Sequence, residues 1–186
     1  EEARRGALAI RHLTFNCAFT SALQRAQETL RIVLDTIGQP QVAVEQHPAL
    51  NERHYGELQG LNKADTIRQF GEQQVHIWRR SYDIAPPKGE SLKDTAARTL
   101  PYFTTMILPR VHAEETVLVV AHGNSLRSII MQLEQLTNEQ ILELNLATGT
   151  PVVYVLSAQG AILSKTVHPL PASSTGGAPS DQRRPG

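Results

Sequence analysis

The hydrophobic positions of the chain alternate between two periods, and this alternation predicts an α/β domain. The run from Thr116 to Ala121 is continuously apolar, as expected of a strand buried in a parallel sheet, and Phe15 to Phe19 is a shorter strand candidate. Between them, apolar residues recur at helical spacing at Leu23, Ala26, Leu30, Val33 and Leu34. Strands that alternate with helices favour a mainly parallel sheet flanked by helices on both faces.

The other segments extend this pattern. Ser21 with Gln24, and Thr137 with Gln140, have the spacing of helix capping boxes, and Pro101 should interrupt or kink a helix that begins near Ser91. We expect further helices at the start of the chain and over 63–70, 72–82 and 123–135, a strand over 41–46, an irregular loop over 47–62, and a hairpin at the sheet edge over 151–157 and 161–167.

Composition narrows the class of protein. The 186 residues are 40% hydrophobic, enough for one domain, and we assign it to residues 1–167. The formal net charge of zero gives no sign of a nucleic-acid or membrane-surface partner. One cysteine excludes an internal disulfide, and no apolar run is long enough to span a membrane, so we expect a cytoplasmic protein.

The two ends of the chain differ from its middle. Glu1 begins inside a predicted helix with no capping residue before it, so we expect that upstream residues are missing. Residues 168–186 are rich in Pro, Gly and Ser, which predicts a disordered tail.

Basic groups follow two of the predicted strands. His122 directly follows the predicted strand over 116–121, and Gly123 and Asn124 turn into a helix whose N-terminus favours a bound anion. Arg25 lies in the first turn of the helix that follows the predicted strand over 15–19, where a cation is unfavourable unless an anion lies nearby. Taken singly, each has a plain alternative, a core histidine and a solvated arginine. Together they indicate an anion site at the carboxyl ends of the strands.

The loop after the predicted strand over 41–46 is dense in chemically active groups. A carboxyl group near a bound anion would have its pKa raised, which suits Glu52 or Glu57 to donate and accept protons near neutral pH. A solvated charged loop is the alternative. The other candidates in and just after this loop are Arg53, His54, Tyr55 and Lys63.

Two adjacent arginines, Arg79 and Arg80, offer guanidinium groups that match phosphate or carboxylate, although a solvated basic face is also possible. The sequence contains no zinc, calcium or Walker motif, so we expect no metal. Phosphate chemistry would then depend on arginine, histidine and helix ends.

In this order, the segments resemble the cofactor-dependent phosphoglycerate mutases of the histidine phosphatase superfamily. The resemblance spans roughly Glu1 to Leu156 and rests on FTSALQRAQET, NERHYGELQG, WRRS, GESL, AHGNSLR and LNLATGTPVVYVL. It implies an enzyme of glycolysis and gluconeogenesis, primed by 2,3-bisphosphoglycerate, that interconverts 3-phosphoglycerate and 2-phosphoglycerate through a phosphohistidine.

The resemblance also implies roles for individual residues. Glu52 would exchange a proton with the substrate hydroxyl, and His122 would stabilise the transferring phosphoryl group with Arg25 beside it. The remaining residues would bind the substrate: Arg53, His54, Tyr55, Lys63, Arg79, Arg80, Gly123 and Asn124.

One departure from the family matters. The family's nucleophile lies in an Arg-His-Gly motif on the first strand, and this sequence contains no such motif. Arg11-His12 is followed by Leu13 and precedes a strand, so we expect His12 to be a partly exposed linker residue. We therefore predict a sheet that lacks its first strand, a nucleophile upstream of Glu1, and negligible mutase activity of the chain alone.

Two alternatives stay open. The chain could act as a broad phosphomonoesterase of the same superfamily, or as a non-catalytic remnant that binds phosphorylated ligands. The resemblance to this family implies that the intact protein is a homo-dimer or tetramer. The sheet edges that a missing strand would leave exposed favour the same expectation.

Overall fold

The computed structural model describes residues 1–170, apart from the side chains of Lys63 and Arg80, so most of the predicted disordered tail lies outside the described residues. Its centre is a parallel sheet in the order β2–β1–β3. The strands are β1 (Cys17–Thr20), β2 (Ala43–Gln46) and β3 (Val117–Val120). The predicted α/β class with a parallel sheet is confirmed.

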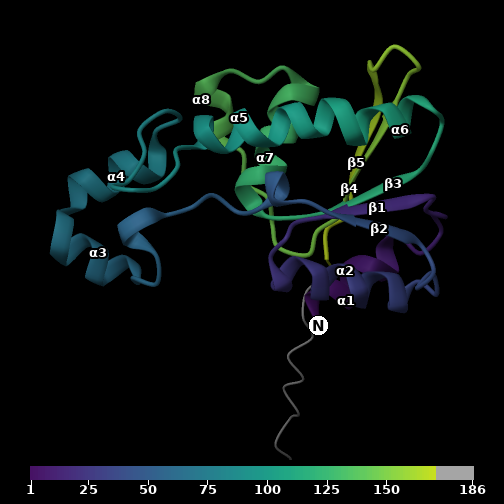
Figure 1. The fold of residues 1–186 in the computed structure, drawn as a ribbon, viewed down its shortest axis with the longest axis horizontal. Helices are drawn as coiled ribbons and strands as arrows, with labels where there is room; N and C mark the ends of the chain where they lie inside the picture. The colour runs from purple at the N-terminus through teal and green to yellow at the C-terminus, as the bar shows by residue number, and fades with distance from the viewer. Residues whose placement is uncertain (171–186) are drawn as a thin grey trace, which may run out of the picture.

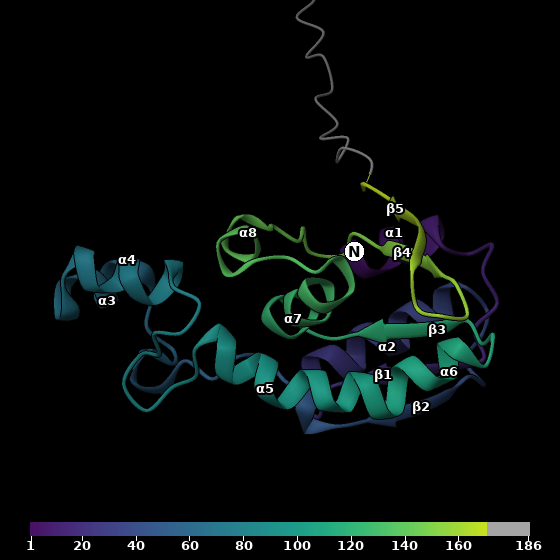
Figure 2. The same ribbon diagram turned by 90° about the horizontal axis from the view of Figure 1, so that it is seen from above.

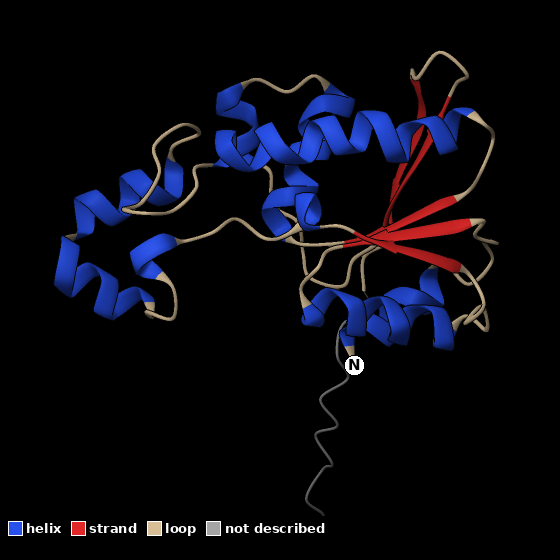
Figure 3. Ribbon diagram, viewed as in Figure 1, coloured by secondary structure: helices blue, strands red, loops and turns tan. Residues whose placement is uncertain are grey.

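Helices cover both faces of this sheet (Figures 1 and 3). On one face lie α1 (Glu2–Ala9) and α2 (Gln24–Thr36), and on the other α5 (Leu92–Tyr102), α6 (Leu108–His112) and α7 (Gly123–Glu134). Side chains of a strand alternate between these layers. Phe19 therefore packs with Tyr102 and Ile129, whereas Ala18 packs with Leu30 and Leu34.

A helical lobe extends away from the sheet beyond the carboxyl end of β2 (Figures 1 and 2). Phe70 and Trp78 hold its two main helices together through an edge-to-face ring contact at 5.2 Å. Gly71 makes the turn between them with a φ of +82°. The elements of this part of the chain are η1 (Pro48–Leu50), η2 (Gly56–Leu58), α3 (Lys63–Phe70) and α4 (Glu72–Arg80).

Two local predictions from the sequence meet different outcomes. Thr137 and Gln140 form the predicted capping box of α8 (Asn138–Glu143). The capping box predicted for Ser21 and Gln24 is wrong, because α2 starts after Leu23 and the Ser21 hydroxyl contacts His122 instead. The buried tertiary contact has displaced the local one.

Pro101 does not end its helix, but the helix is irregular directly after it. The segment from Phe103 to Ile107 is a π-helical turn, and α6 follows without a break. Proline lacks the N–H that an α-helix uses, so a local change of helical pitch is its expected consequence.

The predicted C-terminal hairpin forms from β4 (Val152–Leu156) and β5 (Ile162–Val167), but it does not hydrogen-bond to the sheet. Glu134 at the end of α7 holds it, by accepting from the Tyr154 hydroxyl and pairing with Lys165 at 2.6 Å. The hairpin is therefore anchored through side chains rather than through strand pairing.

The free edge of β3 faces this hairpin without pairing to any strand within residues 1–170. All four β3 residues are only half-buried, against the prediction of a buried strand, while all four β1 residues are buried. Leu118 of β3 and Val153 of β4 nevertheless pack on the same cluster around Ile10 and Phe15. This interruption between β3 and β4 agrees with the expected gap in the sheet.

Candidate active site

His122 sits where the carboxyl ends of β1 and β3 meet. The residue is 8% exposed, and its Nε2 lies 2.7 Å from the Oγ of Ser21, which directly follows β1. The Arg25 Nε–H donates to His122 Nδ1 at 3.4 Å. Because parallel strands bring their carboxyl ends to one edge of the sheet, residues about a hundred positions apart become neighbours here.

The surroundings of His122 favour its neutral form. Burial lowers the pKa of the imidazole, and the positive charges of Arg25 and Arg98 lower it further, while Glu52 acts in the opposite direction. The ring is therefore uncharged near neutral pH in the free protein. A bound anion would favour the protonated ring.

Glu52 lies beside His122, at the N-terminus of α7. Its Oε1 accepts from the backbone N–H of Asn124 at 3.2 Å and of Arg53 at 2.8 Å. A carboxylate at a helix N-terminus is stabilised by the helix dipole and the free N–H groups. Glu57, the other carboxyl considered from the sequence, pairs instead with Lys88 at the surface at 2.8 Å.

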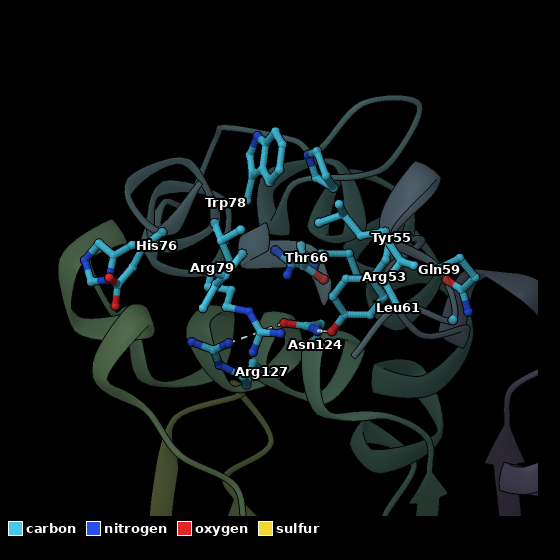
Figure 4. Close-up of a pocket in the computed structure, with 16 residues that line it drawn as sticks. Arg53, Tyr55, Gln59, Leu61, Thr66, His76, Trp78, Arg79, Asn124 and Arg127 are labelled. Carbon is cyan, nitrogen blue, oxygen red and sulfur yellow. Dashed lines mark hydrogen bonds between the residues drawn. The ribbon is translucent and has the colours of Figure 1, made fainter. Parts of the chain in front are cut away.

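A cavity of about 660 Å³ opens between the helical lobe and α7, and Figure 4 shows its walls. Four of the residues predicted from the sequence to bind substrate line it: Arg53, Tyr55, Arg79 and Asn124. Arg53 is buried with its guanidinium 4.8 Å from the centre of the Tyr55 ring, and its Nε has no hydrogen-bond partner among the described residues. Asn124 Nδ2 donates to the Tyr55 hydroxyl at 3.2 Å.

Three other residues named in the sequence analysis, His54, Gly123 and His12, do not line this cavity. His54 is exposed and its Nδ1 accepts from the N–H of Gly56 at 3.1 Å, so its ring turns back to its own loop. Gly123 begins α7 next to Glu52. The side chains of Lys63 and Arg80 lie outside the described residues. His12 is exposed, with its ring 6.3 Å from that of His168.

Comparison with known proteins places this geometry in a family. The profile of the histidine phosphatase superfamily (branch 1) matches residues 1–167. The chain belongs to the histidine phosphatase superfamily. It is 59% identical over 169 residues to a protein of Rhizobium rhizogenes named 2,3-bisphosphoglycerate-dependent phosphoglycerate mutase, covering 90% of this chain and 80% of the relative. A phosphoglycerate mutase of Schizosaccharomyces pombe is 57% identical, with 81% and 72% covered.

Solved structures show the same fold at lower identity. Bacillus stearothermophilus YhfR aligns with a TM-score of 0.74 at 23% identity, covering 87% of this chain and 77% of its own. A mycobacterial glucosyl-3-phosphoglycerate phosphatase aligns with a TM-score of 0.70, also at 23% identity, covering 89% and 82%. These likenesses establish the fold of this superfamily member.

Sequence reasoning missed three residues that the structure brings to the candidate site. Ser21 was interpreted as a helix cap, although its position directly after a strand could have suggested the site. Arg98 of α5 was not identified, because its contacts with distant backbone carbonyls leave no motif in the sequence. Arg127 of α7 lines the cavity and donates to Asn124 Oδ1 at 3.3 Å and to the carbonyl of Ile141.

Arg98 holds the loop that carries Glu52. Its guanidinium donates to the backbone carbonyls of Ala49 at 2.9 Å, Asn51 at 3.0 Å and Glu52 at 3.1 Å. It also pairs with Glu90, whose pKa it lowers. Glu90 in turn accepts from the N–H of His54 at 2.9 Å. The loop over 49–54 is thus held at both ends by one ion pair.

Within the part of the chain that the structure describes, no group of three or more metal-ligating side chains is present, and no helix is long and apolar enough to cross a membrane.

Proposed function

We propose that this chain forms the phosphoglycerate site of a 2,3-bisphosphoglycerate-dependent phosphoglycerate mutase, acting in glycolysis and gluconeogenesis in the cytoplasm. The observation that carries the proposal is the position of Glu52, anchored by the N–H of Asn124, beside His122 and next to an arginine-lined cavity. The mutase relatives, at 59% identity, support the same assignment.

The site suits two acidic groups on one small substrate. His122 and Arg25 would receive the phosphoryl group that moves, because a neutral imidazole that can gain a proton and a guanidinium both stabilise developing negative charge. Arg53 and Arg79 line the cavity, whose walls do not include His122, and would bind the substrate's carboxylate or second phosphate. A simple phosphomonoesterase needs no such second set of cations.

Glu52 would move the proton. As a carboxylate it accepts the proton of the phosphoglycerate hydroxyl that takes up a phosphoryl group, and it then gives that proton to the other substrate oxygen, from which the phosphoryl group leaves. The Asn124 and Arg53 N–H groups hold one carboxylate oxygen. The other oxygen is then available to the substrate.

The residues also fit the primer. A bisphosphorylated molecule requires several cations, and the buried Arg53 with its unpartnered Nε faces the same cavity as Arg79. When bound, 2,3-bisphosphoglycerate supplies the phosphoryl group that primes the enzyme. No metal is needed in this scheme.

Both ring nitrogens of His122 already have protein partners, so the proposal gives it the stabilising role and not that of the phosphorylated residue. The sequence has no Arg-His-Gly. We assign phosphorylation to a histidine outside residues 1–186, on a strand that would pair with the free edge of β3. The intact enzyme would be a homo-dimer or tetramer, and the edge strand β2, all four residues of which are exposed, is one candidate contact.

A second candidate is a chain that binds phosphorylated ligands without catalysis, and the missing Arg-His-Gly favours it. To separate the candidates, we would join the chain to the N-terminal segment of the Rhizobium rhizogenes relative. Isomerisation of 3-phosphoglycerate by the joined protein, well above hydrolysis of p-nitrophenyl phosphate, supports the mutase. Faster hydrolysis would support a phosphatase, and binding without either reaction would support the non-catalytic chain.

A further inference from the structure

The Ser21 hydroxyl makes no helix cap and is fully buried against the imidazole of His122. Its Oγ is 2.7 Å from Nε2, the shortest side-chain contact that His122 makes in the described residues, and it also accepts from the N–H of Leu23 at 3.1 Å. A residue with no exposed surface cannot itself attack a substrate. Its effect must pass through the histidine.

The partner on the other nitrogen indicates where the proton of His122 lies in this arrangement. Arg25 Nε carries a hydrogen and has no acceptor capacity, so His122 Nδ1 must accept and carries no proton. In a neutral imidazole the remaining proton is then on Nε2. The Nε2–H can only donate to Ser21 Oγ, which accepts it at hydrogen-bond distance.

We propose that Ser21 is the positioning residue of His122: its Oγ accepts from Nε2–H, fixes the ring as the Nε2–H tautomer, and leaves the Nδ1 lone pair facing Arg25 and the anion. In this arrangement Nδ1 is the atom that takes up a proton when a phosphoryl group binds, and it then donates to a phosphoryl oxygen. This inference deepens the proposed function, because it assumes that the anion binds between Arg25 and His122.

Neighbouring groups support this assignment. Burial, Arg25 and Arg98 lower the pKa of His122, and only Glu52 opposes them, so the single-proton form prevails in the free protein. The backbone of His122 is held as well, since its N–H donates to Ser125 Oγ at 3.2 Å. Ring orientation and tautomer are therefore both determined before any ligand arrives.

The test is the ¹⁵N NMR spectrum of the 186-residue chain with labelled histidine, with His122 assigned by its absence from His122→Asn. We expect an Nε2 signal typical of a protonated nitrogen and an Nδ1 signal typical of an unprotonated one. In Ser21→Ala the two signals should move toward each other as the tautomers mix, and affinity for inorganic phosphate should fall about 3- to 10-fold, the range of one hydrogen bond.

Ser128→Ala is the matched control, because Ser128 is equally buried but donates to the carbonyl of Asn124 instead. It should leave both His122 signals unchanged. A protonated Nδ1 in the unmodified chain overturns the inference, even where Ser21→Ala fails to fold. The expected tautomer without any phosphate binding would leave the Ser21 assignment intact and contradict the proposed function instead.

Discussion

Arg98 donates to both carboxylate oxygens of Glu90, from Nε to Oε1 and from Nη2 to Oε2, each at 2.8 Å. The pair is only about a quarter exposed, and the guanidinium also reaches the carbonyls of the loop that ends in Glu52. A bidentate pair of this kind is geometrically specific as well as strong. The position of the proposed proton carrier therefore depends on a residue that does not line the cavity.

Replacement of Arg98 by Ala should destabilise the protein by about 2–3 kcal/mol, since several partly buried acceptors lose their donor together. Urea unfolding of the 186-residue chain measures this. Arg31→Ala is the control, because Arg31 makes two ion pairs on α2 but its side chain is 61% exposed, and its replacement should cost clearly less stability than that of Arg98. Equal losses in the two variants would contradict the holding role of Arg98.

Glu52→Gln should abolish most of the isomerisation by the joined protein while leaving ligand binding nearly intact. An amide cannot exchange the proton, so kcat should fall about 10²- to 10⁴-fold with little change in KM. Glu57→Gln, which breaks only the surface pair with Lys88, should leave kcat within about 2-fold of the parent, the change expected for a weak exposed ion pair. If Glu57→Gln were the inactive variant, the two carboxyl groups would have been assigned the wrong way round.

The stability of the chain should fall as pH drops from about 7.5 to 5.5. The folded pKa of His122 lies below its ordinary value of about 6.5, so the unfolded chain binds protons more readily in this range. His122→Asn should show a flatter dependence than the parent, measured by urea unfolding at each pH. Exposed His54→Asn should retain the parent slope.

The ion pair of Glu90 and Arg98 affects the stability of the chain at lower pH than His122 does. Glu90 has a depressed pKa, so its contribution is present above the unfolded pKa of about 4.3 and is lost as pH falls below it. A loss of stability near pH 6 that persists in His122→Asn would show that a group other than His122 titrates there.

Gly56→Ala should be more damaging than Gly38→Ala. Both glycines have a positive φ, near +57° and +73°, so both variants carry backbone strain of about 1 kcal/mol or more. At Gly56, however, an added Cβ would also lie 2.0 Å from the carbonyl oxygen of Pro87, whereas nothing lies within 4 Å at Gly38. Thermal unfolding of the two variants should therefore differ by several degrees, and equal melting temperatures would contradict this close contact.

Local patterns in the sequence predicted the helices and strands well, because caps, periodicity and breakers act over short distances. Thr137 caps α8 as expected, and α3 begins at Lys63 as expected. Ser21 shows the limit of this reasoning. Its spacing to Gln24 indicated a cap, but a buried histidine 101 positions away competes for the same hydroxyl, and no local pattern reports that contact.

The clustering of His122, Asn124 and Arg25 in the candidate site was predictable, because each lies in a motif close to the carboxyl end of a strand. It was not predictable for Arg98, whose partners are backbone carbonyls about 50 positions away and carry no side-chain signal. The hairpin shows a related limit. Both of its strands were predicted, but whether they pair with β3 depends on tertiary contacts that a local pattern does not report.

The most direct test of the account is phosphorylation and turnover by the 186-residue chain compared with the joined protein. Both would be incubated with 2,3-bisphosphoglycerate, followed by intact mass and by conversion of 3-phosphoglycerate. We predict that the 186-residue chain stays unphosphorylated with negligible turnover, and that the joined protein gains one phosphoryl group and isomerises the substrate. Phosphorylation of a histidine within residues 1–186, with turnover to match, would contradict the account.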